Sequence, residues 1–235
     1  MDAVLELRDV HTFIGSFHIL KGVSFAMRAG SLTALLGRNG AGKTTTLRTI
    51  MGLWPAAQGS IRFLGEELRG RPTHEIAALG IGYVPEHRAI FRGLTVEENL
   101  KLAERRRGDL ARRAEWIFSL FPDLKAALKK PAGLLSGGQQ QMLAIARALV
   151  PENRLLLIDE PSEGLAPMLV EHVMAAIHRL REEVPILLVE QNLHAIRHLA
   201  DHYILMEDGR VVRSGPMAEL LGNREWLQRY LGVTA

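Results

Sequence analysis

The stretch GRNGAGKTT at residues 37–45 constrains the fold more than any other part of the sequence. Gly37, four further residues, Gly42, Lys43 and Thr44 have the spacing of a phosphate-binding P-loop. The apolar run SLTALL precedes this loop and the helix-like run TTTLRTIMG begins within it. Successive backbone N–H groups and the positive end of the helix dipole would then face one anion. The alternative is a glycine-rich turn that binds nothing, which the flanking patterns disfavour. The sequence therefore predicts binding of a nucleoside triphosphate.

The loop residues are expected to share the work of holding the phosphates. Lys43 would reach the β- and γ-phosphates, and Thr44 would place its hydroxyl on Mg²⁺. The expected nucleotide contacts in this loop are Gly37, Arg38, Asn39, Gly40, Ala41, Gly42, Lys43, Thr44 and Thr45.

A second phosphate-handling element is LLLIDEPS at residues 155–162, an apolar strand that ends in two carboxylates. An unpaired charge at the end of a buried strand is costly, so these carboxylates need a purpose. A Walker B motif supplies one, because Asp159 would hold Mg²⁺ directly or through water. Glu160 would then orient and polarise the water that attacks the γ-phosphate.

A third element is LLSGGQQQMLAIARAL at residues 134–149. Ser136 is a good helix N-cap, and Gln139 is placed to complete a capping box. The two glycines leave the start of the helix bare, open to a second anion. From spacing alone, a capped core helix without a ligand is an equally good interpretation.

Composition limits the alternatives. With 235 residues, 47% of them hydrophobic and 23% charged, the chain suits one large globular domain or a domain with a sizeable subdomain. The absence of cysteine excludes disulfides and thiolate metal sites. No basic region followed by an apolar core marks a signal peptide, and no apolar run approaches the about 20 residues of a spanning helix. We expect a partner to carry any membrane part.

The net charge of +3 is a mild excess, but basic residues gather at residues 100–116 and 125–130. Acidic residues are interspersed and no aromatic residues alternate with the arginines, which disfavours a nucleic-acid surface. A solvated helix face is the favoured interpretation, and a face toward anionic lipid headgroups stays open.

The strand-like runs predict a mixed α/β fold. Residues 31–36, 155–159 and 186–190 are nearly all apolar, as in parallel strands covered on both faces. Residues 4–10 alternate, and residues 204–212 indicate a hairpin around Asp208 and Gly209. We therefore expect a parallel nucleotide-binding core, an antiparallel sheet beside it and an inserted helical segment. That segment covers residues 95–131, starts with a capping box at Thr95 and is broken at Gly108 and Pro122.

The P-loop, LSGGQ and LLLIDEPS, in that order, closely resemble the ATP-binding subunits of ABC transporters over residues 4–214. The resemblance implies a single ABC ATPase domain over residues 1–235, with a core at 1–94 and 132–235 and a helical subdomain that starts at 95–131. It also implies that two subunits enclose two ATP molecules. In such a dimer the partner's ATP would be contacted by Ser136, Gly137, Gly138 and Gln139.

Within that family, residues 80–100, 159–167 and 187–192 resemble the ATPases of branched-chain amino acid importers, and urea importers are similar. The resemblance implies an ATPase at the cytoplasmic face of the membrane, attached through permease subunits. A second ATPase subunit, identical or homologous, and indirectly a solute-binding protein would be its partners, without nucleic acid. A soluble nucleotide switch is the alternative, whereas proteins acting on ribosomes or DNA usually carry two such domains or a coiled-coil insertion. The residues do not identify the solute.

The chain departs from the family pattern at several places. Glu86 stands where most members have a glutamine near Mg²⁺ and the attacking water, and Gln191 stands where most have a histidine at the γ-phosphate. An amide donates a hydrogen bond but holds no positive charge. Ala166 replaces a usual aspartate. Ile14 aligns with the aromatic residue that stacks on adenine, and Phe17 is a weaker candidate. We expect Glu160, Gln191 and Glu86 to be catalytic, Thr44, Asp159 and Glu86 to serve the metal, and the ATPase to be slow or partner-dependent.

Overall fold

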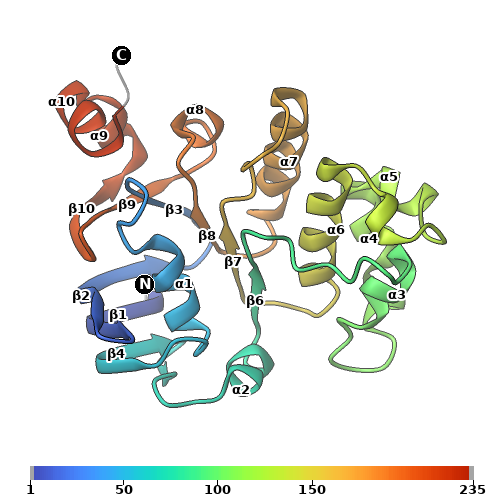
Figure 1. The fold of residues 1–235 in the computed structure, drawn as a ribbon, viewed down its shortest axis with the longest axis horizontal. Coiled ribbons are helices and arrows are strands. Elements are labelled where there is room, and N and C mark those ends of the chain that lie inside the picture. Colours follow the sequence, from blue (N-terminus) through green and yellow to red (C-terminus); the bar gives the residue numbers. More distant parts are fainter. Residues whose placement is uncertain (1–2, 233–235) are drawn as a thin grey trace.

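A four-stranded antiparallel sheet forms one side of the protein, which a computed structural model describes for residues 3–232. Its order is β2-β1-β4-β5 (Figure 1). The strands are β1 (Ala3–Ile14), β2 (Phe17–Arg28), β4 (Ala56–Phe63) and β5 (Glu66–Glu67).

A six-stranded sheet with the order β10-β9-β3-β8-β7-β6 forms the centre. Its strands are β3 (Leu32–Leu36), β6 (Ile81–Val84), β7 (Leu155–Asp159), β8 (Ile186–Val189), β9 (His202–Glu207) and β10 (Arg210–Pro216). All neighbours pair in parallel except β9 and β10, which form the predicted hairpin. Asp208 and Gly209 take positive φ angles of 46° and 73° at its turn. The predicted combination of a parallel and an antiparallel sheet is confirmed.

The apolar strands of the central sheet contribute side chains to two hydrophobic cores, one on each face of the sheet. Leu35, Leu157 and Leu187 pack toward the antiparallel sheet and helix α1 (Lys43–Ile50). Their neighbours Leu36 and Ile158 belong to the other core, against the helices of the opposite face. Successive side chains of a strand point to opposite faces, so a strand buried on both is nearly all apolar.

Strand β2 was not predicted, because its sequence does not alternate regularly. Leu20, Val23, Phe25 and Met27 are its buried apolar residues, and the step from Leu20 to Val23 breaks the period of two. The pairing of β1 with β2 shifts register at four places, and Gly22 takes a φ of 83°. A β-bulge inserts an extra residue and reverses the faces beyond it, which hides a strand from periodicity.

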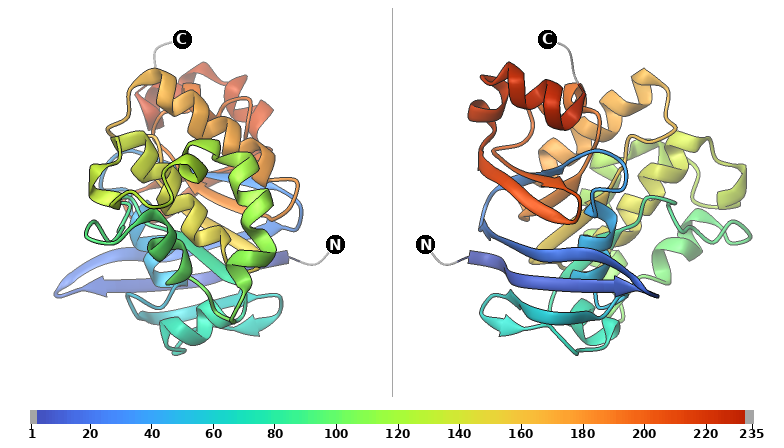
Figure 2. Two further views of the ribbon diagram at one scale, coloured as in Figure 1. Left: turned by 90° about the vertical axis from the view of Figure 1, so that its right-hand side faces the viewer. Right: turned by 60° about the vertical axis from the view of Figure 1, so that its left-hand side comes forward.

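Helices cover the central sheet and extend beyond it (Figure 2). Besides α1 they are α2 (Thr73–Ala78), α3 (Val96–Lys101), α4 (Asp109–Leu120), α5 (Pro122–Ala126), a 3₁₀ turn (Ala132–Leu134), α6 (Gly137–Leu149), α7 (Pro167–Leu180), α8 (Leu193–Ile196), α9 (Met217–Leu221), α10 (Arg224–Trp226) and a π-helical turn (Leu227–Leu231).

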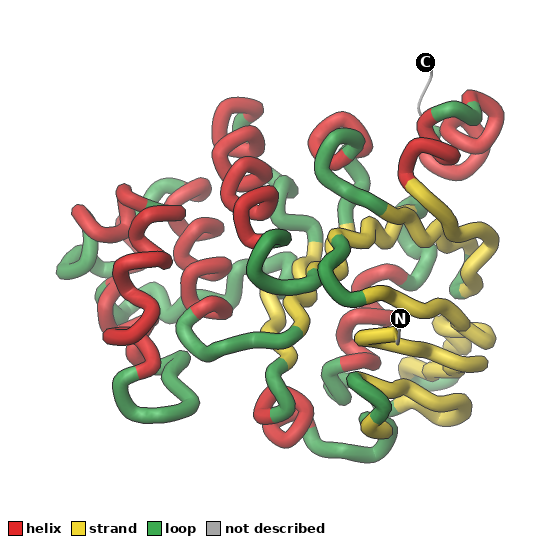
Figure 3. Tube along the Cα trace, turned by 180° about the vertical axis from the view of Figure 1, so that it is seen from behind, coloured by secondary structure: helices red, strands yellow, loops and turns green. Residues whose placement is uncertain are grey.

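Residues 95–131 contain the helices α3, α4 and α5 and no strand, as predicted, and lie at one end of the molecule (Figure 3). Thr95 forms the predicted capping box with Glu98, α4 begins after Gly108, and α5 begins at Pro122. A bridge between Thr95 and Pro131 brings the ends of this segment together. None of the helices within residues 3–232 combines the length and the apolar character needed to span a membrane.

Candidate nucleotide-binding site

The loop at residues 37–42 joins the carboxyl end of β3 to α1, as its motif predicts. Gly37, Gly40 and Gly42 have positive φ angles of 151°, 80° and 102°. A Cβ atom on Gly37 would lie 2.4 Å from the backbone oxygen of Met206 in β9, so no other residue fits there. Helix α1 begins at Lys43, and its N-cap residue, Gly42, provides no side-chain cap. Its first N–H groups are therefore available to an anion.

Lys43 lies at the centre of this loop with only 4% of its surface exposed. Its ammonium group donates to the backbone oxygens of Gly37 (3.0 Å) and Arg38 (3.2 Å) and lies 3.4 Å from Oε1 of Glu160. A buried ammonium needs such partners. These contacts hold the charge inside the loop, where a phosphate would meet it.

Asp159 ends strand β7 and is completely buried. Its Oδ1 accepts a hydrogen bond of 3.0 Å from the Thr44 hydroxyl, and the Tyr83 hydroxyl lies 3.4 Å from Oδ2. Burial, with the carboxylates of Glu160 and Glu86 nearby, raises the pKa of Asp159 to about 6 against the opposing effect of the Thr44 hydrogen bond. A cation beside Thr44 and Asp159 would relieve this excess of negative charge.

The donor set suits Mg²⁺ rather than a metal held by protein alone. Within residues 3–232 there is no group of three or more His, Asp or Glu side chains that could enclose a metal ion. Mg²⁺ keeps several waters and usually takes one or two protein oxygens together with substrate phosphates. The hydroxyl of Thr44 and the carboxylate of Asp159 meet that requirement.

Glu160 and Gln191 form a hydrogen-bonded pair beside Lys43. The Gln191 Nε2 donates to Oε2 of Glu160 over 2.6 Å, while Oε1 of Glu160 faces Lys43. Glu160 has a φ of 44°, which is unusual for a residue with a side chain. Such strain is found where the surrounding structure holds a functional group in place.

Glu190, which the sequence analysis missed, fastens the loops that carry this pair. Its buried carboxylate accepts backbone hydrogen bonds from Ser162 (2.9 Å), Gln191 (3.1 Å) and Asn192 (3.2 Å). Burial raises the pKa of Glu190 despite these bonds, which act in the opposite direction. The signal was present, because Glu190 ends an apolar strand in the same way that Asp159 does.

A cavity of about 420 Å³ opens over the loop. It is lined by Ile19, Asn39, Gly40, Gly42, Lys43, Thr44, Thr45, Glu86, Glu160, Glu163 and Gln191. The sequence analysis also missed Glu163, because this residue lies in the turn after the LLLIDEPS motif and belongs to no recognisable pattern. The pKa of Glu163 is raised, chiefly by burial and next by its hydrogen bond with Glu86. The structure thus gathers Glu86, Glu160 and Gln191 around the glycine-rich loop, although the strands that precede them, β6, β7 and β8, are separated in sequence.

Among the predicted residues, Gly37, Arg38, Ala41 and the buried Asp159 are not part of the lining of this cavity. Two further groups of predicted residues also do not line it. The first is the start of α6, where Ser136 and Gln139 form the predicted capping box while Ser136 and Gly137 are exposed and Gly138 is buried. The second is Ile14, which is half-buried at the end of β1 and pairs with Phe17 across the turn. An apolar side chain does line the cavity, but it is that of Ile19 in β2 and not that of Ile14.

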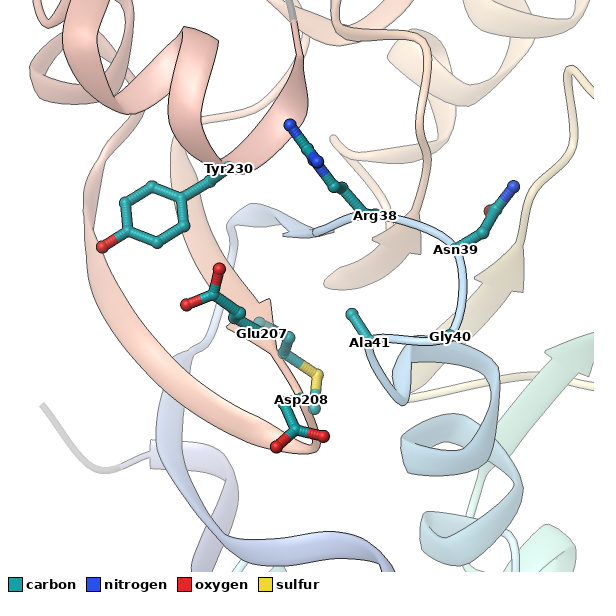
Figure 4. Close-up of a pocket in the computed structure, with 8 residues that line it drawn as sticks. Arg38, Asn39, Gly40, Ala41, Glu207, Asp208 and Tyr230 are labelled. Atoms are coloured by element: carbon teal, nitrogen blue, oxygen red, sulfur yellow. The ribbon is translucent and has the colours of Figure 1, made fainter.

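A smaller cavity of about 290 Å³ lies beside the same loop (Figure 4). It is bounded by Arg38, Asn39, Gly40, Ala41, Met206, Glu207, Asp208 and Tyr230. The Arg38 side chain points toward the helical C-terminal segment that carries Tyr230, and not in the direction of Asn39.

Comparisons with known proteins agree with this geometry. The profile of the family described as ABC transporter matches residues 20–163. The high-affinity branched-chain amino acid transport ATP-binding protein BraG of Pseudomonas aeruginosa is 43% identical, over 97% of this chain and 100% of its own. The probable branched-chain amino acid transport ATP-binding protein LivF of Archaeoglobus fulgidus is 38% identical, over 92% and 93%. A nucleotide-free ATP-binding cassette of an ABC transporter shares the fold with a TM-score of 0.85, at 23% identity and full coverage of both chains.

Proposed function

The chain belongs to the ABC transporter family, and on that premise we propose that it is the ATP-hydrolysing subunit of a membrane importer for branched-chain or similar hydrophobic amino acids. One observation carries the catalytic part. The lining of one cavity beside a loop with free N–H groups includes Lys43, Thr44, Glu160 and Gln191, and the buried Asp159 accepts a hydrogen bond from Thr44. These are the parts that phosphoryl transfer to water needs.

Each group has a distinct task in this proposal. The backbone N–H groups of residues 37–45 and the Lys43 ammonium bind the phosphates, and Thr44 and Asp159 would hold Mg²⁺, which neutralises charge on the phosphate oxygens. Glu160 accepts a hydrogen bond from the attacking water and orients it. Gln191 holds the Glu160 carboxylate in place, and Glu86 lines the same cavity. Adenine would meet an apolar wall beside β1 and β2, for which Ile14 and Ile19 are the candidates.

The exposed start of α6 supports a role for a second subunit. Ser136, Gly137, Gly138 and Gln139 lie outside the cavity of their own chain. A second ATPase subunit, identical or homologous, would receive them at its own nucleotide, so that ATP binding closes a dimer. The permease subunits would dock on the helical subdomain that starts at residues 95–131, at the cytoplasmic face of the membrane. A solute-binding protein would act on the outside, and urea or another amide is the alternative cargo.

A soluble nucleotide switch is the second candidate, and Gln191 favours it because an amide carries no positive charge toward the γ-phosphate. Replacement of Glu160 by glutamine separates the two functions. We expect Glu160→Gln to slow hydrolysis by roughly 10²–10⁴-fold, the range of a positioned general base, while ATP binding persists. With saturating ATP and Mg²⁺ the variant should run as a dimer in size-exclusion chromatography with light scattering.

The control is Glu115→Gln, which removes an exposed carboxylate from α4 and should leave hydrolysis unchanged. A switch that scarcely hydrolyses ATP would show the same low rate with and without Glu160. A Glu160→Gln chain that stays monomeric with saturating ATP would contradict the shared site.

A further inference from the structure

A larger cavity, of about 1170 Å³, lies at the edge of the central sheet opposite the glycine-rich loop. Gly80 and Arg154 line it and directly precede β6 and β7, whereas residues 37–42 follow β3. These strands belong to the parallel part of the sheet, so the two cavities lie at opposite strand ends. The proposed function makes no use of the larger cavity.

Arginine dominates the lining of this cavity. Two carboxylates, Asp109 and Glu152, face a set of six arginines: Arg105, Arg106, Arg107, Arg112, Arg113 and Arg154. Five of the six come from the basic stretch at residues 100–116. The sixth, Arg154, comes from the turn before β7, so the fold gathers charges that the sequence separates. Like charges held at close range repel one another unless an anion lies between them.

The carboxylates nearby neutralise little of this charge. Asp109 is buried and already accepts backbone hydrogen bonds from Arg105 (2.9 Å) and Arg106 (2.7 Å), and it pairs with Arg112. Within residues 3–232, no carboxylate lies within ion-pair distance of the side chains of Arg106, Arg107, Arg113 or Arg154. Several guanidinium groups are therefore uncommitted.

Two of the six arginines show that the cavity wall is ordered. The Arg105 guanidinium donates to the backbone oxygen of Ile81 (3.0 Å) and to Oδ1 of Asn153 (3.2 Å), which ties the stretch to the sheet. The Arg113 guanidinium lies 4.3 Å over the ring of Trp116, and its Nε is buried without a hydrogen-bond partner. Both side chains are therefore held in place at the cavity wall.

We propose that this cavity binds a soluble anion that carries several phosphate groups. Guanidinium groups donate pairs of parallel hydrogen bonds to phosphate oxygens, and several uncommitted ones can serve more than one phosphate. The site is concave, which suits a small molecule better than the flat surface of a membrane. Its lining residues include no aromatic side chain on which a nucleic-acid base could stack. An anion held by Arg107 and Arg154 would also connect the helical segment to the central sheet.

Calorimetric titration with inorganic tripolyphosphate tests the proposal, in a chain that also carries Lys43→Ala to suppress binding at the glycine-rich loop. We expect saturable binding that weakens as salt rises from about 50 to about 200 mM. The double variant Arg107→Ala with Arg154→Ala should lower the affinity for tripolyphosphate by about tenfold or more, because it loses two guanidinium groups that donate charged hydrogen bonds to the phosphates. These two side chains are exposed and make no internal hydrogen bond within the described residues, so the variant should fold.

The matched control is Arg197→Ala with Arg224→Ala, which removes the same charge from exposed positions elsewhere and should leave the affinity unchanged. Absence of binding, or equal affinity in the Arg107 and Arg154 variant, would overturn the proposal. Orthophosphate that binds as tightly as tripolyphosphate would overturn the requirement for several phosphates. Sedimentation with phosphatidylserine vesicles is the last arm, and vesicle binding through Arg107 and Arg154 without tripolyphosphate binding would assign the surface to a membrane instead.

Discussion

At the residue scale, Gln191 is the side chain whose role can be tested most directly. Its amide donates to Glu160 over 2.6 Å, and the same carboxylate faces Lys43. Removing the amide frees the carboxylate to approach Lys43 and leaves the attacking water less well oriented. We expect Gln191→Ala to lower kcat by about tenfold while the affinity for ATP changes little, because the interaction serves the transition state.

Steady-state turnover and calorimetric titration with a non-hydrolysable ATP analogue measure the two quantities separately. Gln58→Ala, at an exposed position in β4, is the control. Parental turnover in Gln191→Ala, with and without the membrane partner, would show that the contact with Glu160 is not used in catalysis.

Asp159 makes the stability of the nucleotide-free chain depend on pH. Its pKa is raised from 3.8 to about 6 in the folded chain. Between these values the folded state keeps a proton that the unfolded state has lost, so this residue's contribution to stability falls as pH rises from about 4 to about 6. We expect Asp159→Asn to remove that dependence. The free energy of unfolding of the variant, compared with that of the parent, should therefore be more favourable at pH 7 than at pH 4.

Urea unfolding of parent and variant, at several pH values between about 4 and 7, measures the difference. The comparison cancels carboxyl groups such as Asp208, whose pKa is lowered by its hydrogen bond with Lys21 and which therefore act with the opposite sign. If the difference in free energy of unfolding between parent and variant stayed constant over this pH range, the raised pKa of Asp159 would be contradicted.

At the scale of elements, the start of α6 has two separable roles. The Ser136 hydroxyl accepts the Gln139 N–H over 3.3 Å, and the Gln139 side chain accepts the Ser136 N–H over 3.1 Å. Loss of an N-cap costs about 1 kcal/mol of stability. We therefore expect Ser136→Ala to lower the free energy of unfolding by about that amount. Chemical denaturation measures it, with Ser16→Ala in the β1–β2 turn as the control.

The structural and functional roles of Ser136 can be told apart with a threonine. Ser136→Thr keeps a capping hydroxyl and should recover most of the stability. If the serine also contacts the partner's nucleotide, Ser136→Ala should weaken ATP-dependent dimerisation of the Glu160→Gln chain by more than its stability loss explains. Unchanged stability in Ser136→Ala would mean that the cap is not formed in solution.

At the scale of the whole molecule, the site proposed above combines parts that one chain does not bring together. The residues at the start of α6 lie outside the cavity, and the carboxylates Glu86, Glu160 and Glu163 surround it. In the proposed mechanism both features favour an open resting state, because closure would have to overcome charge repulsion and would need a second subunit. A membrane partner that binds the closed state better would shift the population by its differential affinity.

We therefore expect the isolated chain to hydrolyse ATP slowly and the reconstituted transporter to be at least about tenfold faster, a shift that needs only about 1.4 kcal/mol of differential binding. The measurement is ATP turnover of the purified chain against the transporter in vesicles with its binding protein and candidate amino acids. A free chain as fast as the assembly would contradict the prediction. Stimulation by urea and not by hydrophobic amino acids would assign the alternative cargo.

The sequence by itself determined the features that depend only on residues close together in the chain. The glycine-rich loop, the carboxylates that end β7, the caps at Thr95 and Ser136 and the hairpin at Asp208 each depend on a few neighbouring positions. Backbone sterics and local hydrogen bonds act within that range, so spacing and residue type suffice to predict them. The apolar strands were predictable for the same reason, because burial on both faces leaves no polar position.

Only the tertiary structure decided which of these features meet. Thr44 and Asp159 are 115 positions apart, and they touch because β3 and β7 flank β8 in the same parallel sheet. That strand order depends on how entire elements pack, which local periodicity does not encode. Strand β2 was hidden by its bulge, and Arg154 joined the other arginines only through the fold. Long-range contacts of this kind arise from the shared burial of distant segments, and so the cavity at the glycine-rich loop and the arginine-lined cavity became visible only in three dimensions.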